Sequence, residues 1–312
     1  PLDAYREALA QVAPEGSFEH VRESLQNGLR VAICTEGGSM GATARDLFGR
    51  LGWPMDNEGI TLLHEEPSST YHGIGVYDGV NHGVDPGKWQ VYKHIGAQEL
   101  LLRGEAHVVF IWDPDGDRFN IVTQAPARIA EEAVTYGLEV EPLDTERVLV
   151  YFKPNQIYFL LTALRVERLA ATGDLSRYDW SVAITFPTSR SIIEIAQAIG
   201  AKHGVTINPV LVPVGFKYFG ELAGAAEAAI TAKDLPFSFT DVTGLTTSLG
   251  AHPRLLIMAE ESGGAALGPA APIVSRQGRR TSLAPKEKDG MQIGVMALCL
   301  AAKLHREGGS MA

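Results

Sequence analysis

The sequence predicts an α/β protein with two tandem three-layer α/β/α domains and mixed, mostly parallel sheets. Short β-rich runs alternate with helical patterns from about Leu29 onward, which is typical of α/β layers. The 312 residues, 45% of them hydrophobic, are enough for two cores, since one core usually stops growing at roughly 250 residues. We expect the domains at residues 1–142 and 143–312, because residues 137–146 form a polar stretch that no periodic pattern crosses.

The individual elements follow from local apolar patterning. In the first expected domain, strands are predicted at residues 29–34, 60–64, 107–112 and 119–123, and helices at 1–12, 18–27, 42–51 and 94–103. In the second, strands are predicted at 148–152, 180–186, 206–212 and 255–259, and helices at 156–171, 189–203, 221–232 and 290–304. Residues 263–288 form a loop-rich segment, and connections of that length are usually functional or disordered.

Composition and charge exclude several classes of protein. The net charge is −10 and no basic stripe is present, so we expect no nucleic-acid partner. Cys34 and Cys299 lie in apolar runs and predict buried thiols, with neither a disulfide framework nor a zinc site. The longest strongly apolar run is shorter than the ~20 residues that span a bilayer, and no signal peptide precedes the first helix, so we expect a cytoplasmic protein without a membrane partner.

The first residue is Pro1 rather than Met, which indicates a processed or trimmed piece.

The most informative stretch is FIWDPDGDRF, in which an apolar strand runs into Asp113, Asp115 and Asp117. Carboxylates at every second position, with a glycine that permits a sharp turn, can converge on one hard cation. Without a cation, three crowded acids repel one another. Magnesium leaves coordination positions open for phosphate oxygens, which suits phosphoryl transfer.

The acidic loop has three alternative interpretations. A solvated acidic turn is the simplest. An EF-hand is disfavoured, because the glycine precedes the third aspartate and Gln124 stands at the twelfth position, where a glutamate is needed. A magnesium-dependent phosphatase with Asp113 as nucleophile would normally carry its DxD at the end of the first strand of a single domain.

DPDGDR resembles the metal-binding loop of the α-D-phosphohexomutase superfamily, the phosphoglucomutases and phosphomannomutases. Three further segments resemble that superfamily and follow in its order: VPVGFKYFG at 212–220, AEESGG at 259–264 and EKDGMQIGVMALCLAA at 287–302. The resemblance implies family domains 2 and 3. The Gly-rich residues 37–52 also fit the first strand-to-helix turn of family domain 2, for which we favour a turn without a ligand.

The resemblance also implies roles for individual residues. The three aspartates would hold Mg²⁺, Arg118 would sit beside a phosphoserine or the substrate phosphate, and Lys288 would act as general acid or base. The implied substrate-binding residues are Gly215, Lys217, Glu260 and Ser262, with Glu261 shaping the loop. For both Lys217 and Lys288, an ordinary surface lysine is the alternative. The EES triplet resembles glucose-type enzymes, so glucose 1-phosphate and 6-phosphate are the favoured pair, with phosphomannomutase specificity as the alternative.

The implied activity is an intramolecular phosphotransfer between hexose 1-phosphate and hexose 6-phosphate through a phosphoserine enzyme, with glucose 1,6-bisphosphate as activator of the full enzyme. Neither the family's phosphoserine loop nor its phosphate-clamp loop is found in this sequence. We therefore expect the missing N- and C-terminal domains of a parent chain as partners, and no turnover by these 312 residues alone. The alternative from another class is a non-catalytic sugar-phosphate-binding protein.

Overall fold

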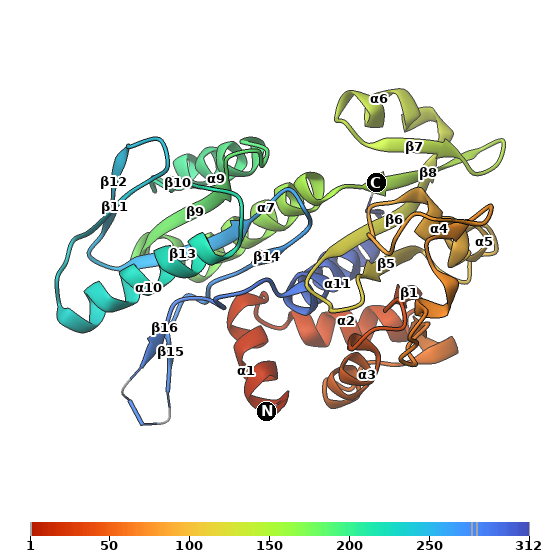
Figure 1. The fold of residues 1–312 in the computed structure, drawn as a ribbon, viewed down its shortest axis with the longest axis horizontal. Coiled ribbons are helices and arrows are strands. Elements are labelled where there is room, and N and C mark those ends of the chain that lie inside the picture. The colour runs from red at the N-terminus through yellow and green to blue at the C-terminus, as the bar shows by residue number, and fades with distance from the viewer. Residues whose placement is uncertain (1, 276, 279, 312) are drawn as a thin grey trace. The chain divides into compact units, whose positions relative to one another are not determined.

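The protein forms two compact units in the computed structural model, which describes residues 2–275, 277–278 and 280–311 (Figure 1). The four-stranded unit comprises Pro1–Pro14 and Tyr158–Ile293, and the six-stranded unit comprises Glu15–Ile157 and Gly294–Ala312. Parallel and antiparallel strands combine with helices in each, so the predicted α/β fold class is confirmed. The domain limits 1–142 and 143–312 stay a prediction. Of the helix expected at 1–12, the first residue lies outside the described part.

The six-stranded unit is built on a mixed sheet with the strand order β2-β1-β5-β6-β8-β7. In that order the strands are Ile60–Leu63, Val31–Cys34, Val108–Trp112, Phe119–Pro126, Arg147–Phe152 and Glu139–Pro142. β1 pairs in parallel with β2 and β5, and the other three strands are antiparallel to their neighbours. The chain runs from β1 outward to β2 and returns to the other side of β1 as β5. Ligands of open α/β sheets bind at such a reversal, beyond the carboxyl ends of the strands.

Helices cover both faces of this sheet. On one face α4 (Trp89–His94) and α5 (Ala97–Leu102) pack against Ala32, Val109 and Val122. On the other, the Phe48 ring of α3 (Met40–Arg50) lies 6.4 Å from that of Trp112. α2 (Ser17–Gln26) is joined to α11 (Gly290–Arg306) by a hydrogen bond from Ser24 to the carbonyl of Ala302. These layers hold the carboxyl ends of β1 and β5 in place.

Several elements differ from the sequence prediction. One helix was predicted at residues 94–103, but Gly96 adopts φ 68° and separates α4 from α5. β7 was not predicted, because a four-residue edge strand with two acidic residues carries little apolar signal. The unit also contains α6 (Ala130–Thr135) and the hairpin of β3 (Val76–Tyr77) and β4 (Val80–Asn81), neither of which was predicted.

The four-stranded unit has the strand order β10-β9-β13-β14. In that order the strands are Asn208–Val212, Asp179–Thr185, Pro253–Ala259 and Ala265–Ala266, with only the last antiparallel. α10 (Lys217–Ala232) packs on one face, where Phe219 and Leu222 meet Ala183 of β9. On the other face, Arg165 of α7 (Pro154–Thr172) lies over the ring of Trp180. The remaining elements are α1 (Leu2–Val12), α8 (Asp174–Arg177), α9 (Ser191–Lys202), the hairpin β11 (Phe237–Thr240) with β12 (Thr246–Gly250), and the hairpin β15 (Ile273–Val274) with β16 (Thr281–Ser282).

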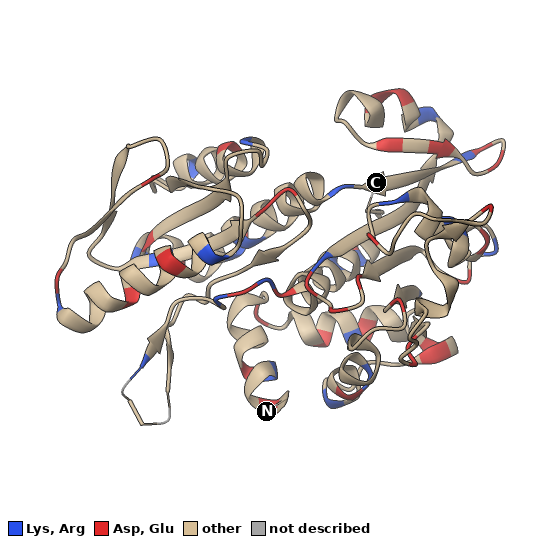
Figure 2. Ribbon diagram, in the orientation of Figure 1, with Lys and Arg blue, Asp and Glu red and all other residues tan. Residues whose placement is uncertain are grey.

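Basic and acidic residues are scattered along the ribbon of each unit (Figure 2). Among the described residues, no helix combines the length and the apolar character needed to span a bilayer.

Candidate functional site

The acidic loop predicted from the sequence joins β5 to β6 in the six-stranded unit. One ligand oxygen each from Asp113, Asp115 and Asp117 lies within 4.8 Å of the others, so the three side chains can hold a metal ion. Within the described part of the chain, no other group of three or more His, Cys, Asp or Glu residues brings its ligand atoms this close. Asp113 is 7% exposed at the base of the loop, and Asp115 lies at its exposed tip.

The loop's own backbone sets the position of Asp113. The amide of Gly116 donates to the carbonyl of Asp113 at 3.0 Å, and Gly116 supplies the φ of 76° that the turn requires. The amide of Arg118 donates to Oδ1 of Asp113, also at 3.0 Å. Burial raises the pKa of Asp113 to about 7, helped by the charges of Asp117 and Asp115 and opposed by that amide. Protons therefore compete with a cation for this carboxylate near neutral pH.

Arg118 is held by carboxylates on several sides. Its Nε lies 3.7 Å from Oδ2 of Asp113 and 3.7 Å from Oδ1 of Asp117, and its Nη1 lies 3.6 Å from Oδ2 of Asp85. Asp85, from the loop before α4, was not predicted as a site residue. One guanidinium cannot neutralise this many carboxylates, so the site favours a further cation.

Glu36 is a second acidic residue that the sequence interpretation missed. It lies two residues after the end of β1, is fully buried, and neither carboxylate oxygen has a hydrogen-bond partner in the described part of the chain. Burial, and then the charges of Asp113 and Asp85, raise its pKa to about 9. Its φ of 51° is a strained backbone conformation, which occurs preferentially at functional sites. The available signal was its position, since an acid follows an apolar strand directly before the Gly-rich turn.

The Gly-rich turn after Glu36 supports the acidic loop. A Cβ on Gly38 would lie 1.8 Å from the carbonyl oxygen of Pro114, and the amide of Ser39 donates to that oxygen at 2.8 Å. A Cβ on Gly116 would likewise meet the Met40 side chain at 2.3 Å. The two backbones therefore touch directly. The turn supplies backbone support to the loop, and it remains our prediction that it binds no ligand itself.

Replacing Gly38 by alanine is expected to displace the acidic loop, because its Cβ cannot coexist with the Pro114 carbonyl. We expect a loss of about 1–3 kcal/mol in the free energy of unfolding and at least an about tenfold loss of divalent-cation affinity. The matched control is Gly49→Ala in α3, where a Cβ meets nothing within 4 Å. That control should gain about 0.5–1 kcal/mol. Urea unfolding measures the free energy of unfolding, and calorimetric titration measures the divalent-cation affinity. A Gly38→Ala variant that equals the parent in both quantities would contradict this account.

An open groove of about 610 Å³ lies beside the acidic loop. Its lining combines the Gly-rich turn, the segment after β2 and the tip of the acidic loop: Gly37, Gly38, Ser39, Pro67, Ser68, Ser69, Tyr71, Pro114 and Asp115. Asp115 therefore faces a space large enough for a sugar phosphate.

The four-stranded unit brings together Glu260, Ser262 and Lys288 of the predicted sugar site. Glu260 follows β13 and is 4% exposed. Its Oε1 accepts a hydrogen bond from the Ser262 hydroxyl at 2.6 Å and lies 3.1 Å from Nζ of Lys288. A Cβ on Gly264 would lie 2.3 Å from Cδ of Lys288, so the glycine makes room for the lysine stem.

The neighbours of this cluster fix its shape. Oε2 of Glu261 accepts a hydrogen bond from Thr185 at 2.7 Å. Asp289, next to Lys288, is reached by the Tyr5 hydroxyl at 2.6 and 2.8 Å from its two oxygens. Gly215, at φ 119°, precedes α10, and Lys217 is its first residue with Nζ 4.9 Å from the Tyr218 ring centroid. This cluster and the acidic loop belong to different units.

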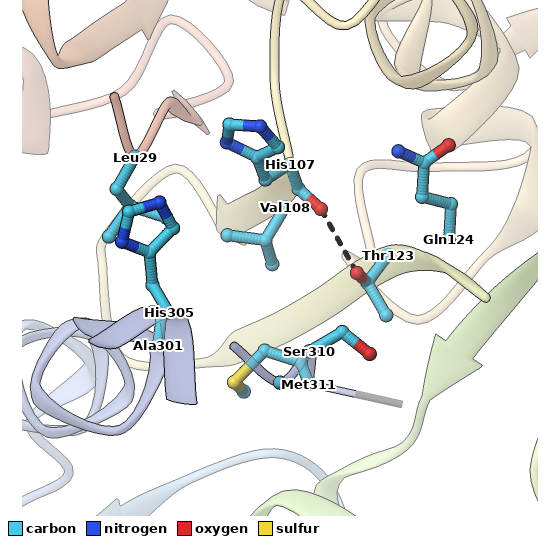
Figure 3. Close-up of a pocket in the computed structure, with 10 residues that line it drawn as sticks. Leu29, His107, Val108, Thr123, Gln124, Ala301, His305, Ser310 and Met311 are labelled. Atoms are coloured by element: carbon cyan, nitrogen blue, oxygen red, sulfur yellow. Dashed lines mark hydrogen bonds between the residues drawn. The ribbon is translucent and has the colours of Figure 1, made fainter. Parts of the chain in front are cut away.

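A second, smaller cavity of about 130 Å³ lies in the six-stranded unit (Figure 3). The rings of His107 and His305 approach each other there, with centroids 6.1 Å apart, and Thr123 donates to the carbonyl of His107. The pKa of His107 is lowered, first by burial and then by His305 and Arg30. The cavity contains none of the predicted site residues.

Comparison with known proteins gave matches among solved structures only. No family model matches the chain, and no curated protein matches it. Two crystal structures of N-acetylglucosamine-phosphate mutase, described as a member of the alpha-D-phosphohexomutase superfamily, match over 99% of this chain. That superfamily is the one its sequence motifs resemble.

The similarity to these structures is distant. The apo form is 10% identical with a TM-score of 0.46, and the substrate complex is 12% identical with a TM-score of 0.47. The match covers 56% of the apo chain and 49% of the chain in the complex. This chain thus spans about half the length of the mutase chains that it matches.

Proposed function

We propose that this chain provides the metal-binding and sugar-binding parts of a phosphohexomutase, which interconverts hexose 1-phosphate and hexose 6-phosphate in the cytoplasm. The observation that supports it most is the convergence of Asp113, Asp115 and Asp117 on one point at the carboxyl end of β5. The buried carboxyl of Glu36 and the excess of acids around Arg118 also fit a hard cation. Mg²⁺ is the cation we propose, and it would neutralise charge on the transferring phosphoryl group.

The protein's own residues then take distinct roles. The three aspartates hold the cation. Arg118, anchored by Asp85, presents its guanidinium to a phosphoserine or the substrate phosphate. Glu260 accepts hydrogen bonds from sugar hydroxyls, and Ser262 both donates and accepts.

The remaining predicted residues belong to the four-stranded unit. Lys288, whose Nζ lies 3.1 Å from Oε1 of Glu260, would move a proton at a sugar oxygen. Gly215 and Lys217 would contribute the start of α10 to the substrate side. Glucose phosphates are the preferred substrates, and mannose phosphates are the alternative. The phosphoserine, the phosphate clamp and the response to glucose 1,6-bisphosphate would come from further N- and C-terminal domains of a parent chain.

Binding of glucose 1-phosphate to the purified chain tests the proposal. In the presence of Mg²⁺, ³¹P and ¹H NMR should show binding that Glu260→Gln weakens at least about tenfold, because one charged hydrogen-bond partner is lost. The control Glu58→Gln, an exposed residue, should bind as the parent does. Mg²⁺-independent binding that Glu260→Gln leaves unchanged would contradict the proposal.

Turnover distinguishes the candidate functions. With glucose 1,6-bisphosphate present, the isolated chain should give no glucose 6-phosphate, whereas the parent chain with its further domains should. A parent chain that binds glucose phosphate without turnover would favour the non-catalytic binding protein. Release of inorganic phosphate that depends on Asp113 would favour the phosphatase.

A further inference from the structure

A thiol and three imidazoles gather near the carboxyl ends of β1 and β2. We call Cys34, His64, His72 and His94 the thiol–histidine cluster. The His64 ring centroid lies 5.2 Å from that of His72 and 6.0 Å from that of His94. Sγ of Cys34 lies 3.6 Å from Nδ1 of His64. Cys34 is buried, His64 is half-buried, and His72 and His94 are exposed, so the cluster leads from the surface to the thiol.

Hydrogen bonding prepares His72 to act as a ligand. Its Nε2 lies 2.7 Å from the carbonyl oxygen of Glu66, which can only accept, so Nε2 carries a proton that it donates. The lone pair of a neutral His72 is therefore on Nδ1. Metal-binding histidines typically donate their second N–H to a carbonyl or carboxylate in this way, which fixes the tautomer and the ring.

The protonation states disfavour nucleophilic chemistry at Cys34, and an ion would have to displace the thiol proton. Burial raises the pKa of the Cys34 thiol well above its ordinary value, so without a cation it is a neutral thiol and a poor nucleophile. The pKa of His64 is lowered by burial first and then by His72 and His94, which keeps its imidazole neutral. A neutral imidazole can donate its lone pair to a metal.

Three residues in or beside the thiol–histidine cluster have strained backbone conformations. His64, Tyr71 and His72 have φ values of 52°, 49° and 53°, although none is a glycine. Such conformations persist where the surrounding structure enforces them, and they cluster at binding sites. The amide of Gly37 donates to the carbonyl of His64 at 2.8 Å, so the strained segment is tied to the Gly-rich turn.

We propose that Cys34, His64, His72 and His94 form a second cation site, for a borderline-soft divalent ion of the zinc class. Two ligands on a tetrahedral Zn²⁺ with one sulfur and one nitrogen lie roughly 3.5 Å apart, which matches the Cys34–His64 separation. The ligand atoms of His72 and His94 do not yet lie this close, so an ion would have to draw both rings towards the Cys34–His64 pair. Sulfur and imidazole ligands select against Mg²⁺, whereas the oxygen ligands of the acidic loop favour it, so the two sites take different ions.

Cobalt titration of the metal-free chain tests this site directly. Co²⁺ should give intense visible absorption typical of tetrahedral coordination and a near-ultraviolet thiolate-to-metal band, and one equivalent of Zn²⁺ should abolish both. Cys34→Ser should lose the thiolate band. His64→Asn, chosen because asparagine tolerates a positive φ, should lower Zn²⁺ affinity at least about tenfold. The control His20→Asn, an exposed residue of α2, should bind Zn²⁺ as the parent does.

One further variant and a check of folding make the result of the titration unambiguous. Asp113→Asn should leave the cobalt spectrum and Zn²⁺ affinity unchanged, because the acidic loop is a separate site. Circular dichroism shows whether Cys34→Ser and His64→Asn are folded. If one variant is unfolded, the metal binding of the other tests the proposal. The proposal is wrong if the parent shows no thiolate band, or if Zn²⁺ affinity falls in Asp113→Asn and not in the folded cluster variants.

Discussion

Replacing Asp113 by asparagine is expected to lower Mg²⁺ affinity at least about tenfold at about pH 8, the largest effect on cation binding of any single change in the acidic loop. Asp113 is the most buried of the three aspartates, and its Oδ1 is oriented by the Arg118 amide at 3.0 Å. Asparagine keeps the shape and a carbonyl acceptor for that amide, so the change removes charge and leaves the loop in place. Calorimetry with Mg²⁺ and spin resonance with Mn²⁺ measure the loss.

The pH dependence of the same titration checks the cause. The pKa of Asp113 is about 7, held up chiefly by burial, so a cation must displace a proton below that pH. Parent affinity should therefore rise as the pH rises through about 7, and Asp113→Asn should lack this part of the rise. Asp46→Asn, at an exposed position of α3, is the control and should follow the parent. Equal affinities for Asp113→Asn and the parent would place the cation elsewhere.

Replacing Glu36 by glutamine is expected to stabilise the metal-free protein at alkaline pH. The folded state holds the Glu36 carboxyl at a pKa of about 9, raised first by burial, whereas an unfolded glutamate titrates near about 4.3. Between those values the folded state retains a proton that the unfolded chain has released, so stability falls as the pH rises. Glutamine cannot ionise and removes this loss. At about pH 8 the gain should be roughly 2–5 kcal/mol, and near about pH 4 it should vanish.

Urea unfolding of the parent and of Glu36→Gln at about pH 4, 6 and 8 tests this linkage. The exposed Glu58→Gln serves as control and should give the same small difference at each pH. A stability difference between Glu36→Gln and the parent that does not change with pH would mean that Glu36 titrates normally in the folded protein.

The parts of the site that were predictable are local in sequence. Asp113, Asp115 and Asp117 share one tight turn, and Glu260 and Ser262 are two residues apart, so spacing alone brought each set together. Fold class was predictable for a related reason: apolar runs such as the one around β5 are fully buried, and their strand character needs no tertiary information.

The parts that could not be predicted depend on contacts between distant segments. Glu36 and Asp85 approach the acidic loop from the loops after β1 and before α4. Because both are far from the acidic loop in sequence, no local pattern predicts that they lie beside it. The break at Gly96 was missed, because a glycine within an apolar helical pattern does not show whether it adopts a positive φ. The role of Gly38 required the position of the Pro114 carbonyl, which only the β1–β5 pairing supplies.

The direct contact of Gly38 with Pro114 limits how far the DPDGDR segment can be transplanted. The hexapeptide alone lacks the Gly38 backbone against which Pro114 packs and the Ser39 amide that donates to the Pro114 carbonyl. Grafted onto a strand end of another protein, the hexapeptide would carry the three carboxylates without the backbone contacts that orient them. A transplant would need the carboxyl ends of both β1 and β5 together with the loops that follow them.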